Sequence, residues 1–98
     1  YSFEVVFAKQ IEALGKEGDV AIGISTSGKA KNVNAGIRQA KKMGIKTIVL
    51  TGTSGAELAK TADVSLIVPS NITARIQEAH ITVGHIICQL IEEKMFEG

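Results

Sequence analysis

The stretch Gly18-Asp19-Val20-Ala21-Ile22-Gly23-Ile24-Ser25-Thr26-Ser27-Gly28 decides how this chain folds. Its first half is apolar and rich in β-branched residues, which predicts a buried parallel strand over 19–24. Three hydroxyl residues and a glycine follow, and helical spacing begins near Asn32, so residues 25–31 form a predicted strand-to-helix turn. Backbone N–H groups at the helix start, the helix dipole and hydroxyl donors all favour an anion. The candidate phosphate-binding residues are Ser25, Thr26 and Ser27.

The rest of the chain alternates between helical and strand patterns. Apolar spacing predicts helices over 3–14, 32–43, 56–61 and 73–96, the first ending near Gly15 and the second capped by Gly44. Apolar runs predict two further strands over 46–50 and 64–68. Strands separated by helices form a parallel sheet with right-handed crossovers, and such sheets bind ligands beyond the carboxyl ends of their strands.

Two loops are expected at that edge of the sheet. Residues 25–28 and 51–55 follow successive strands, so a ligand held by the first loop could touch the second. The alternative is that both are ordinary turns, in which Ser, Thr and Gly supply caps and tight angles. Three consecutive hydroxyl residues exceed what one cap needs, which favours the binding role for the first loop. Lys29 and Lys31 lie in that loop and would raise its affinity for an anion.

Composition excludes several classes of protein. The 98 residues are 45% hydrophobic and 21% charged, which indicates one small globular domain. The net charge of +1 is spread along the chain, unlike the basic face of a nucleic-acid binder, and no apolar run is long enough to span a membrane. The lone Cys88, in an apolar run, is expected to be a small core residue in a reduced, cytoplasmic compartment. Because residue 1 is not methionine, we expect it to be a cut in a longer chain.

Common catalytic and nucleotide-binding motifs are missing. Ser25 has Gly23 before it but Ser27 after it, so it is not a nucleophile elbow. Neither a Gly-x-Gly-x-x-Gly fingerprint nor a P-loop ending occurs, and we therefore expect no nucleotide cofactor.

The last predicted helix carries the remaining polar chemistry. His80 is on the apolar side and is expected to be a satisfied core or interface residue. His85 is about 140° around the helix from His80, so the two do not form an i, i+4 metal pair. Gln77 and His85 are about 12 Å apart along the axis and about 80° apart around it, at the limit of reach for one ion. A shared ligand would lie between two extended side chains, or a packed neighbouring chain would supply one of them.

These motifs together resemble a sugar-isomerase (SIS) domain of the phosphoheptose isomerase type. The resemblance covers nearly the whole chain. It is carried by the Ser-Thr-Ser-Gly turn at 25–28, by 50–52, 62–63 and 68–70, and by the Arg-Ile-Gln-Glu-x-His run at 75–80 with a second His at 85. Residues 1–98 are thus expected to be one SIS domain, incomplete at its N-terminal side.

The resemblance implies a fold, an activity and a set of roles. The fold would be a flavodoxin-like, three-layer αβα sandwich with a parallel sheet, assembled as a homotetramer. The activity would be conversion of sedoheptulose 7-phosphate to D-glycero-D-manno-heptose 7-phosphate, in lipopolysaccharide precursor synthesis. Ser25, Thr26 and Ser27 would hold the phosphate. Gln77 would contact the substrate, Gln77 and His85 would be the active-site pair and the family's zinc ligands, and His85 would be the acid/base.

Two departures from the family pattern shape these expectations. The family continues Ser-Thr-Ser-Gly with Asn-Ser, where this chain has Lys29 and Ala30, so one phosphate-binding hydroxyl is missing. The chain is also about half the family's length, without the upstream His and Glu that complete metal binding and proton transfer. The 98 residues alone are therefore expected to bind sugar phosphate weakly, to lack turnover and to self-associate through exposed apolar faces.

Two other functions fit the same residues. One is a non-enzymatic SIS module, either a sugar-phosphate sensor or a protein-binding regulator like the replication-initiation factor that shares this fold. An adaptor has no chemical need for both Gln77 and His85, which favours the enzyme. The other is an isomerase of a hexose or pentose phosphate, which would use the same phosphate site.

Overall fold

A computed structural model of the chain describes residues 3–96. A turn of 3₁₀ helix over Phe3–Val5 leads into the first helix, and another over Thr53–Gly55 leads into the third. The helices are α1 (Val6–Leu14), α2 (Lys31–Lys42), α3 (Ala56–Ala59) and α4 (Thr73–Met95), and the strands are β1 (Val20–Ile24), β2 (Lys46–Gly52) and β3 (Val64–Val68).

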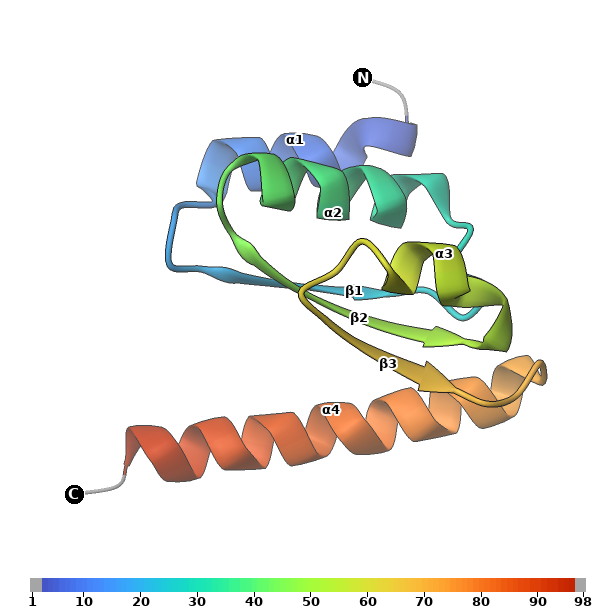
Figure 1. Cartoon of the computed structure of the whole chain (residues 1–98). Coiled ribbons are helices and arrows are strands. Elements are labelled where there is room, and N and C mark those ends of the chain that lie inside the picture. The colour runs from blue at the N-terminus through green and yellow to red at the C-terminus, as the bar shows by residue number, and fades with distance from the viewer. Residues whose placement is uncertain (1–2, 97–98) are drawn as a thin grey trace.

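The three strands form a parallel sheet in the order β1-β2-β3, with β2 in the centre. Val20 pairs with Lys46 across the first ladder, and Ile48 pairs with Val64 across the second. Helices α1, α2 and α3 lie on one side of the sheet and α4 crosses the other (Figure 1). The arrangement confirms the predicted α/β fold with helices on both faces of a parallel sheet.

The core lies between the central strand and the helices on its α2 side. Ile37 of α2, Val49 of β2 and Leu58 of α3 form one buried cluster. On the other face, Ile76 of α4 packs against Gly52, where an added Cβ atom would collide with the Ile76 Cδ1. Both faces of β2 are therefore covered, as its apolar sequence predicts.

The first strand is less buried than predicted. Gly23 faces α2 and leaves room there for Ile37, and the alternate residues of β1 therefore point to the opposite face. Those residues remain largely exposed: Val20 at 57%, Ile22 at 47% and Ile24 at 54%. The prediction of a buried strand fails because β1 is an edge strand and α4 leaves this part of its face uncovered.

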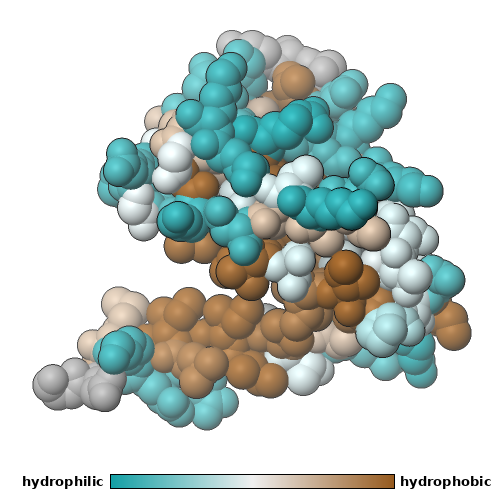
Figure 2. All heavy atoms as spheres, in the orientation of Figure 1, coloured by the Kyte–Doolittle hydropathy of each residue, from teal (hydrophilic) through white to brown (hydrophobic). Residues whose placement is uncertain are grey.

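The prediction of a buried Cys88 is also wrong, since Cys88 is exposed. It lies in the second half of α4, which diverges from the sheet (Figure 1). Ile86, Leu90 and Ile91 in the same half are more than half exposed. Figure 2 shows a hydrophobic band along α4 and along the part of the molecule that faces it. This apolar surface supports the expected self-association, which stays a prediction.

Most element boundaries agree with the sequence to within two residues. The second strand is longer than expected and runs on to Gly52, and the short third helix ends at Ala59. Asp19, which was expected in the first strand, lies just before β1. Its carboxylate accepts hydrogen bonds from the backbone N and the Nζ of Lys16, within the turn that precedes the strand. Asp63, before β3, accepts hydrogen bonds from the backbone N and the Oγ1 of Thr47, and these bonds lower the pKa of its carboxyl group.

The two loops expected beside each other do touch. Gly28 has a φ of +70°, and a Cβ atom added there would collide with the Cα of Gly55. Glycine is required at this point for both the left-handed backbone and the close approach. The contact fixes the first loop against the start of α3.

The contact predicts that Gly28→Ala is more destabilising than the same change at another positive-φ glycine. Gly44 has a φ of +75°, but nothing lies within 4 Å of its added Cβ atom. We expect Gly44→Ala to cost about 1–2 kcal/mol for the backbone alone, and Gly28→Ala about 1–3 kcal/mol more for the collision. Urea unfolding of both variants measures the difference, and equal losses of stability would show that the loops are not in contact.

Candidate active site

A cleft of about 740 Å³ lies between the loop after β1 and the helix α4. Its walls include three of the predicted phosphate-binding residues and the predicted active-site glutamine. The lining residues are Ile24, Ser25, Thr26, Ser27, Ala30, Gln77, His80, Ile81 and Gly84. The structure therefore brings the Ser-Thr-Ser turn and Gln77 together, although about 50 residues separate them in the sequence. Residues 51–55 do not line this cleft; Gly55 packs against Gly28, and the backbone N of Gly52 donates to the oxygen of Thr26.

The loop wall is held by hydrogen bonds of its own. Ser25 is only 7% exposed, and its Oγ accepts a hydrogen bond of 3.0 Å from the backbone N of Gly28. The Oγ of Ser27 accepts one of 3.1 Å from the backbone N of Lys29. In both bonds the serine oxygen accepts, so each hydroxyl hydrogen stays available to donate a further hydrogen bond. They can therefore shape the turn and still donate to an anion.

The start of α2 opens beside this loop. Ala30 is the N-cap residue, and no side chain caps the helix. The backbone N of Val33 is bonded to the Asn32 side chain, and that of Asn34 is bonded to the oxygen of Ala30. An uncapped helix start presents unsatisfied N–H groups and the positive end of the helix dipole. This is the environment in which a phosphate group binds.

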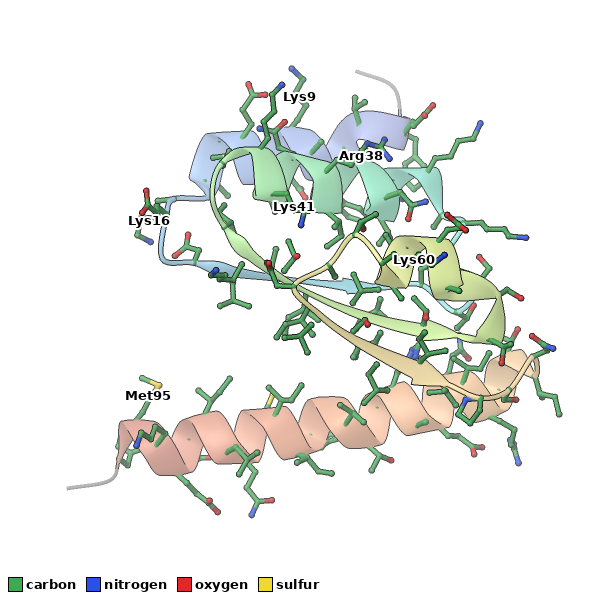
Figure 3. All side chains as sticks on the ribbon, viewed as in Figure 1. Lys9, Lys16, Arg38, Lys41, Lys60 and Met95 are labelled. Atoms are coloured by element: carbon green, nitrogen blue, oxygen red, sulfur yellow. The ribbon has the colours of Figure 1, made fainter. Side chains whose placement is uncertain are left out.

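The charged side chains around the cleft are few. Arg75 and Glu78 of α4 form an exposed ion pair with each other at 2.8 Å. Lys9, Lys16, Arg38, Lys41 and Lys60 lie on the side of the sheet away from α4 (Figure 3). Two further basic residues have exposed side chains near the cleft: Lys29 is in the loop, and Lys31, which was expected in the loop, is the first residue of α2. The loop thus offers neutral donors at its surface and two cations beside it.

The helical wall is a single stripe of α4. Gln77, His80, Ile81 and Gly84 follow the i, i+3, i+4, i+7 spacing of one helix face. His80 is buried, with its Nε2 2.9 Å from the backbone oxygen of Thr51. No atom lies within 4 Å of a Cβ atom added at Gly84, so the cleft is open at this position. The expectation of a satisfied core histidine is confirmed at Nε2, but His80 also lines the cleft.

His85 lies outside this stripe. It is exposed, and it is not among the residues that line the cleft. At about 100° per residue, it is turned about 80° from Gln77 and about 100° from Gly84 around the helix. The structure therefore brings Gln77, but not His85, to the phosphate loop.

The sequence spacing from Gln77 could have predicted that His80 and Gly84 line the same site. Both fall at helical intervals from Gln77 and must share its face. From the apolar pattern of the helix, the sequence predicts only a core or interface role for His80. Ile24 and Ile81, the apolar parts of the walls, carry no sequence signal of a site.

Comparison with known proteins agrees with this geometry. The SIS domain family matches residues 4–88. A phosphoheptose isomerase of Sulfurimonas denitrificans is 53% identical over 96 residues, covering 98% of this chain and 49% of that protein. A probable phosphoheptose isomerase of Thermoplasma acidophilum is 56% identical over 94 residues, covering 96% and 52%. The chain thus spans about half the length of the curated relatives it matches.

Solved structures give the same result. A phosphoheptose isomerase from Neisseria gonorrhoeae is similar with a TM-score of 0.88 and 46% identity, covering 93% of this chain and 52% of that one. One from Francisella tularensis has a TM-score of 0.89 and 40% identity, covering 95% and 50%.

The loop geometry predicts the effect of restoring a hydroxyl at the cleft. Ala30 lines the cleft and caps α2, so a serine there would add a donor beside the other hydroxyls. We expect Ala30→Ser to tighten inorganic phosphate binding about tenfold, the size of one hydrogen bond to a charged group. Isothermal titration calorimetry measures this, with Ala13→Ser on α1 as the matched control. An unchanged affinity would mean that the hydroxyl does not matter.

Proposed function

This chain belongs to the SIS domain family, and from that premise we propose that the protein that carries it is a phosphoheptose isomerase. The reaction would interconvert sedoheptulose 7-phosphate and D-glycero-D-manno-heptose 7-phosphate. The observation that supports this most is the shared cleft of the Ser-Thr-Ser turn and Gln77. The names of the relatives favour an isomerase over a binding module, since both relatives and both structures compared above carry it.

The two walls of the cleft suggest how the substrate lies. The phosphate would bind Ser25, Thr26 and Ser27 and the start of α2, because donors and dipole converge there. The sugar would then extend across the cleft toward α4, where the amide of Gln77 can both donate and accept hydrogen bonds. A heptose phosphate held at both ends would present its carbonyl carbon and the adjacent carbon to the groups between the walls.

Isomerisation between an aldose and a ketose moves a proton between neighbouring carbons, which requires an acid/base group. We assign this role to His85, because an imidazole can both donate and accept a proton. Since His85 is turned about 80° from Gln77 around α4, the complete site must reach around the helix or include residues from elsewhere. The rest of the protein or a second copy in the proposed homotetramer would supply them.

The residues described here do not form a zinc site by themselves. No group of three or more His, Cys, Asp or Glu side chains lies together within residues 3–96. Gln77 and His85 would supply two ligands at the limit of their reach, whereas zinc takes three or four ligands from a protein. A zinc ion bound by this pair, as the family resemblance implies, therefore needs ligands from outside these residues.

The half-length of the chain bears on what it can do alone. We propose that residues 1–98 bind sugar phosphate weakly and do not catalyse its isomerisation, because the cleft holds a phosphate loop but no acid/base pair. None of the helices within residues 3–96 is long and apolar enough to cross a membrane. The cytoplasmic location and the role in lipopolysaccharide synthesis stay predictions.

The proposed function predicts that His85→Ala abolishes isomerisation. In the full-length protein, loss of an acid/base group is expected to lower kcat by about 100-fold or more. Turnover of sedoheptulose 7-phosphate is measured for wild type and variant, with and without added zinc. Gln89→Ala, one turn further along the exposed side of α4, is the matched control and should keep its activity. A wild type that is inactive in both conditions would favour the sugar-phosphate-binding module instead.

A further inference from the structure

One ring nitrogen of His80 forms a hydrogen bond, and the other has no hydrogen-bond partner among the described residues. Its Nε2 lies 2.9 Å from the backbone oxygen of Thr51, and a carbonyl oxygen can only accept, so Nε2 carries the hydrogen. In the neutral ring, Nδ1 is then an acceptor. This Nδ1 is buried and has no hydrogen-bond partner within residues 3–96. The bond to Thr51 also fixes the ring, so the two nitrogens cannot exchange roles.

A buried acceptor without a donor has lost its hydrogen bonds to water and gained none in exchange, which destabilises the protein. Because His80 lines the cleft, its unpaired Nδ1 indicates that a hydrogen-bond donor reaches this atom when a ligand is bound. The hydroxyls of Ser25 and Ser27 are on the opposite wall of the cleft, across from His80. The amide of Gln77 is on the same wall as His80, three residues earlier on the helix.

The position of Gln77 suits this bond. Residues three apart on a helix have Cβ atoms about 5–6 Å apart, within reach of a glutamine amide and an imidazole. Gln77 is exposed, and no hydrogen bond holds its amide to another residue described in the structure. Its side chain can therefore rotate toward His80 when a ligand enters.

We propose that His80 is the positioning residue of Gln77: when the cleft is filled, Nδ1 accepts a hydrogen bond from the Nε2–H of Gln77. An amide has one donor end and one acceptor end. Tying the donor end to His80 aims Oε1 into the cleft, toward the hydroxyls of a sugar or a cation. This inference rests on the proposed function, since it assumes that Gln77 contacts the bound sugar phosphate.

The test separates the two nitrogens of the ring. His80→Gln keeps an N–H group that can reach the Thr51 oxygen but removes the Nδ1 lone pair, whereas His80→Ala removes both. In the full-length protein we expect His80→Gln to keep the melting temperature of the wild type, to raise the KM for sedoheptulose 7-phosphate about tenfold, and to leave binding of inorganic phosphate unchanged. His80→Ala should lower the melting temperature as well.

A spectroscopic measurement reads the contact directly. In ¹⁵N-labelled protein saturated with ligand, the Gln77 side-chain amide should show one proton shifted downfield and slowed in exchange, and His80→Gln should remove this signature. Gln77→Glu, which cannot donate, should make the further change His80→Gln silent in KM. Such non-additivity is the mark of two groups that act together.

Each outcome decides the matter. If His80→Gln matches the wild type in KM and in the Gln77 amide signal, the only role of His80 is its hydrogen bond to Thr51, and the proposal fails. If His80→Gln unfolds like His80→Ala, the Gln77 amide spectrum of the ligand-saturated wild type decides instead: a downfield, slowly exchanging proton supports the bond to His80, and its absence overturns the proposal. If the wild type isomerises no sugar phosphate, the proposed function fails, while the Gln77 amide signals of the wild type and of His80→Gln saturated with sedoheptulose 7-phosphate still decide the contact with His80, because binding requires no turnover.

Discussion

The site depends on the hydrogen bonds at the carboxyl end of the central strand. The oxygen of Leu50 accepts from the backbone N of Ser25, and the backbone N of Gly52 donates to the oxygen of Thr26, both at 3.0 Å. The oxygen of Thr51, between them, accepts from His80 at 2.9 Å. Three consecutive residues of β2 thus hold the phosphate loop on one side and α4 on the other. The width of the cleft follows from these bonds.

The sequence predicts the parts of this arrangement that local chemistry determines. Alternating apolar runs predict the order of strands and helices, and the hydroxyl residues after β1 predict the anion-binding turn. The contact of His80 with Thr51 could not be predicted, because it joins residues 29 apart in the sequence. Burial failed for β1 and Cys88 for a related reason: an apolar sequence indicates that a surface will be covered but not which segment covers it.

The relatives are about twice as long as this chain. Within the described residues, exposed apolar side chains gather on β1, on β3 and on the second half of α4. His85 lies in that half of α4, away from the phosphate loop. Under the proposed function, the part of the site that this chain supplies is the phosphate end, and the proton-transfer end would include residues from outside it.

The most direct test of this account is a crystal structure of the full-length protein with sedoheptulose 7-phosphate bound. The account predicts the phosphate within hydrogen-bond distance of Ser25, Thr26 and Ser27 at the start of α2, and the sugar extending to Gln77. A phosphate bound elsewhere, with the cleft between this loop and α4 empty, would contradict it.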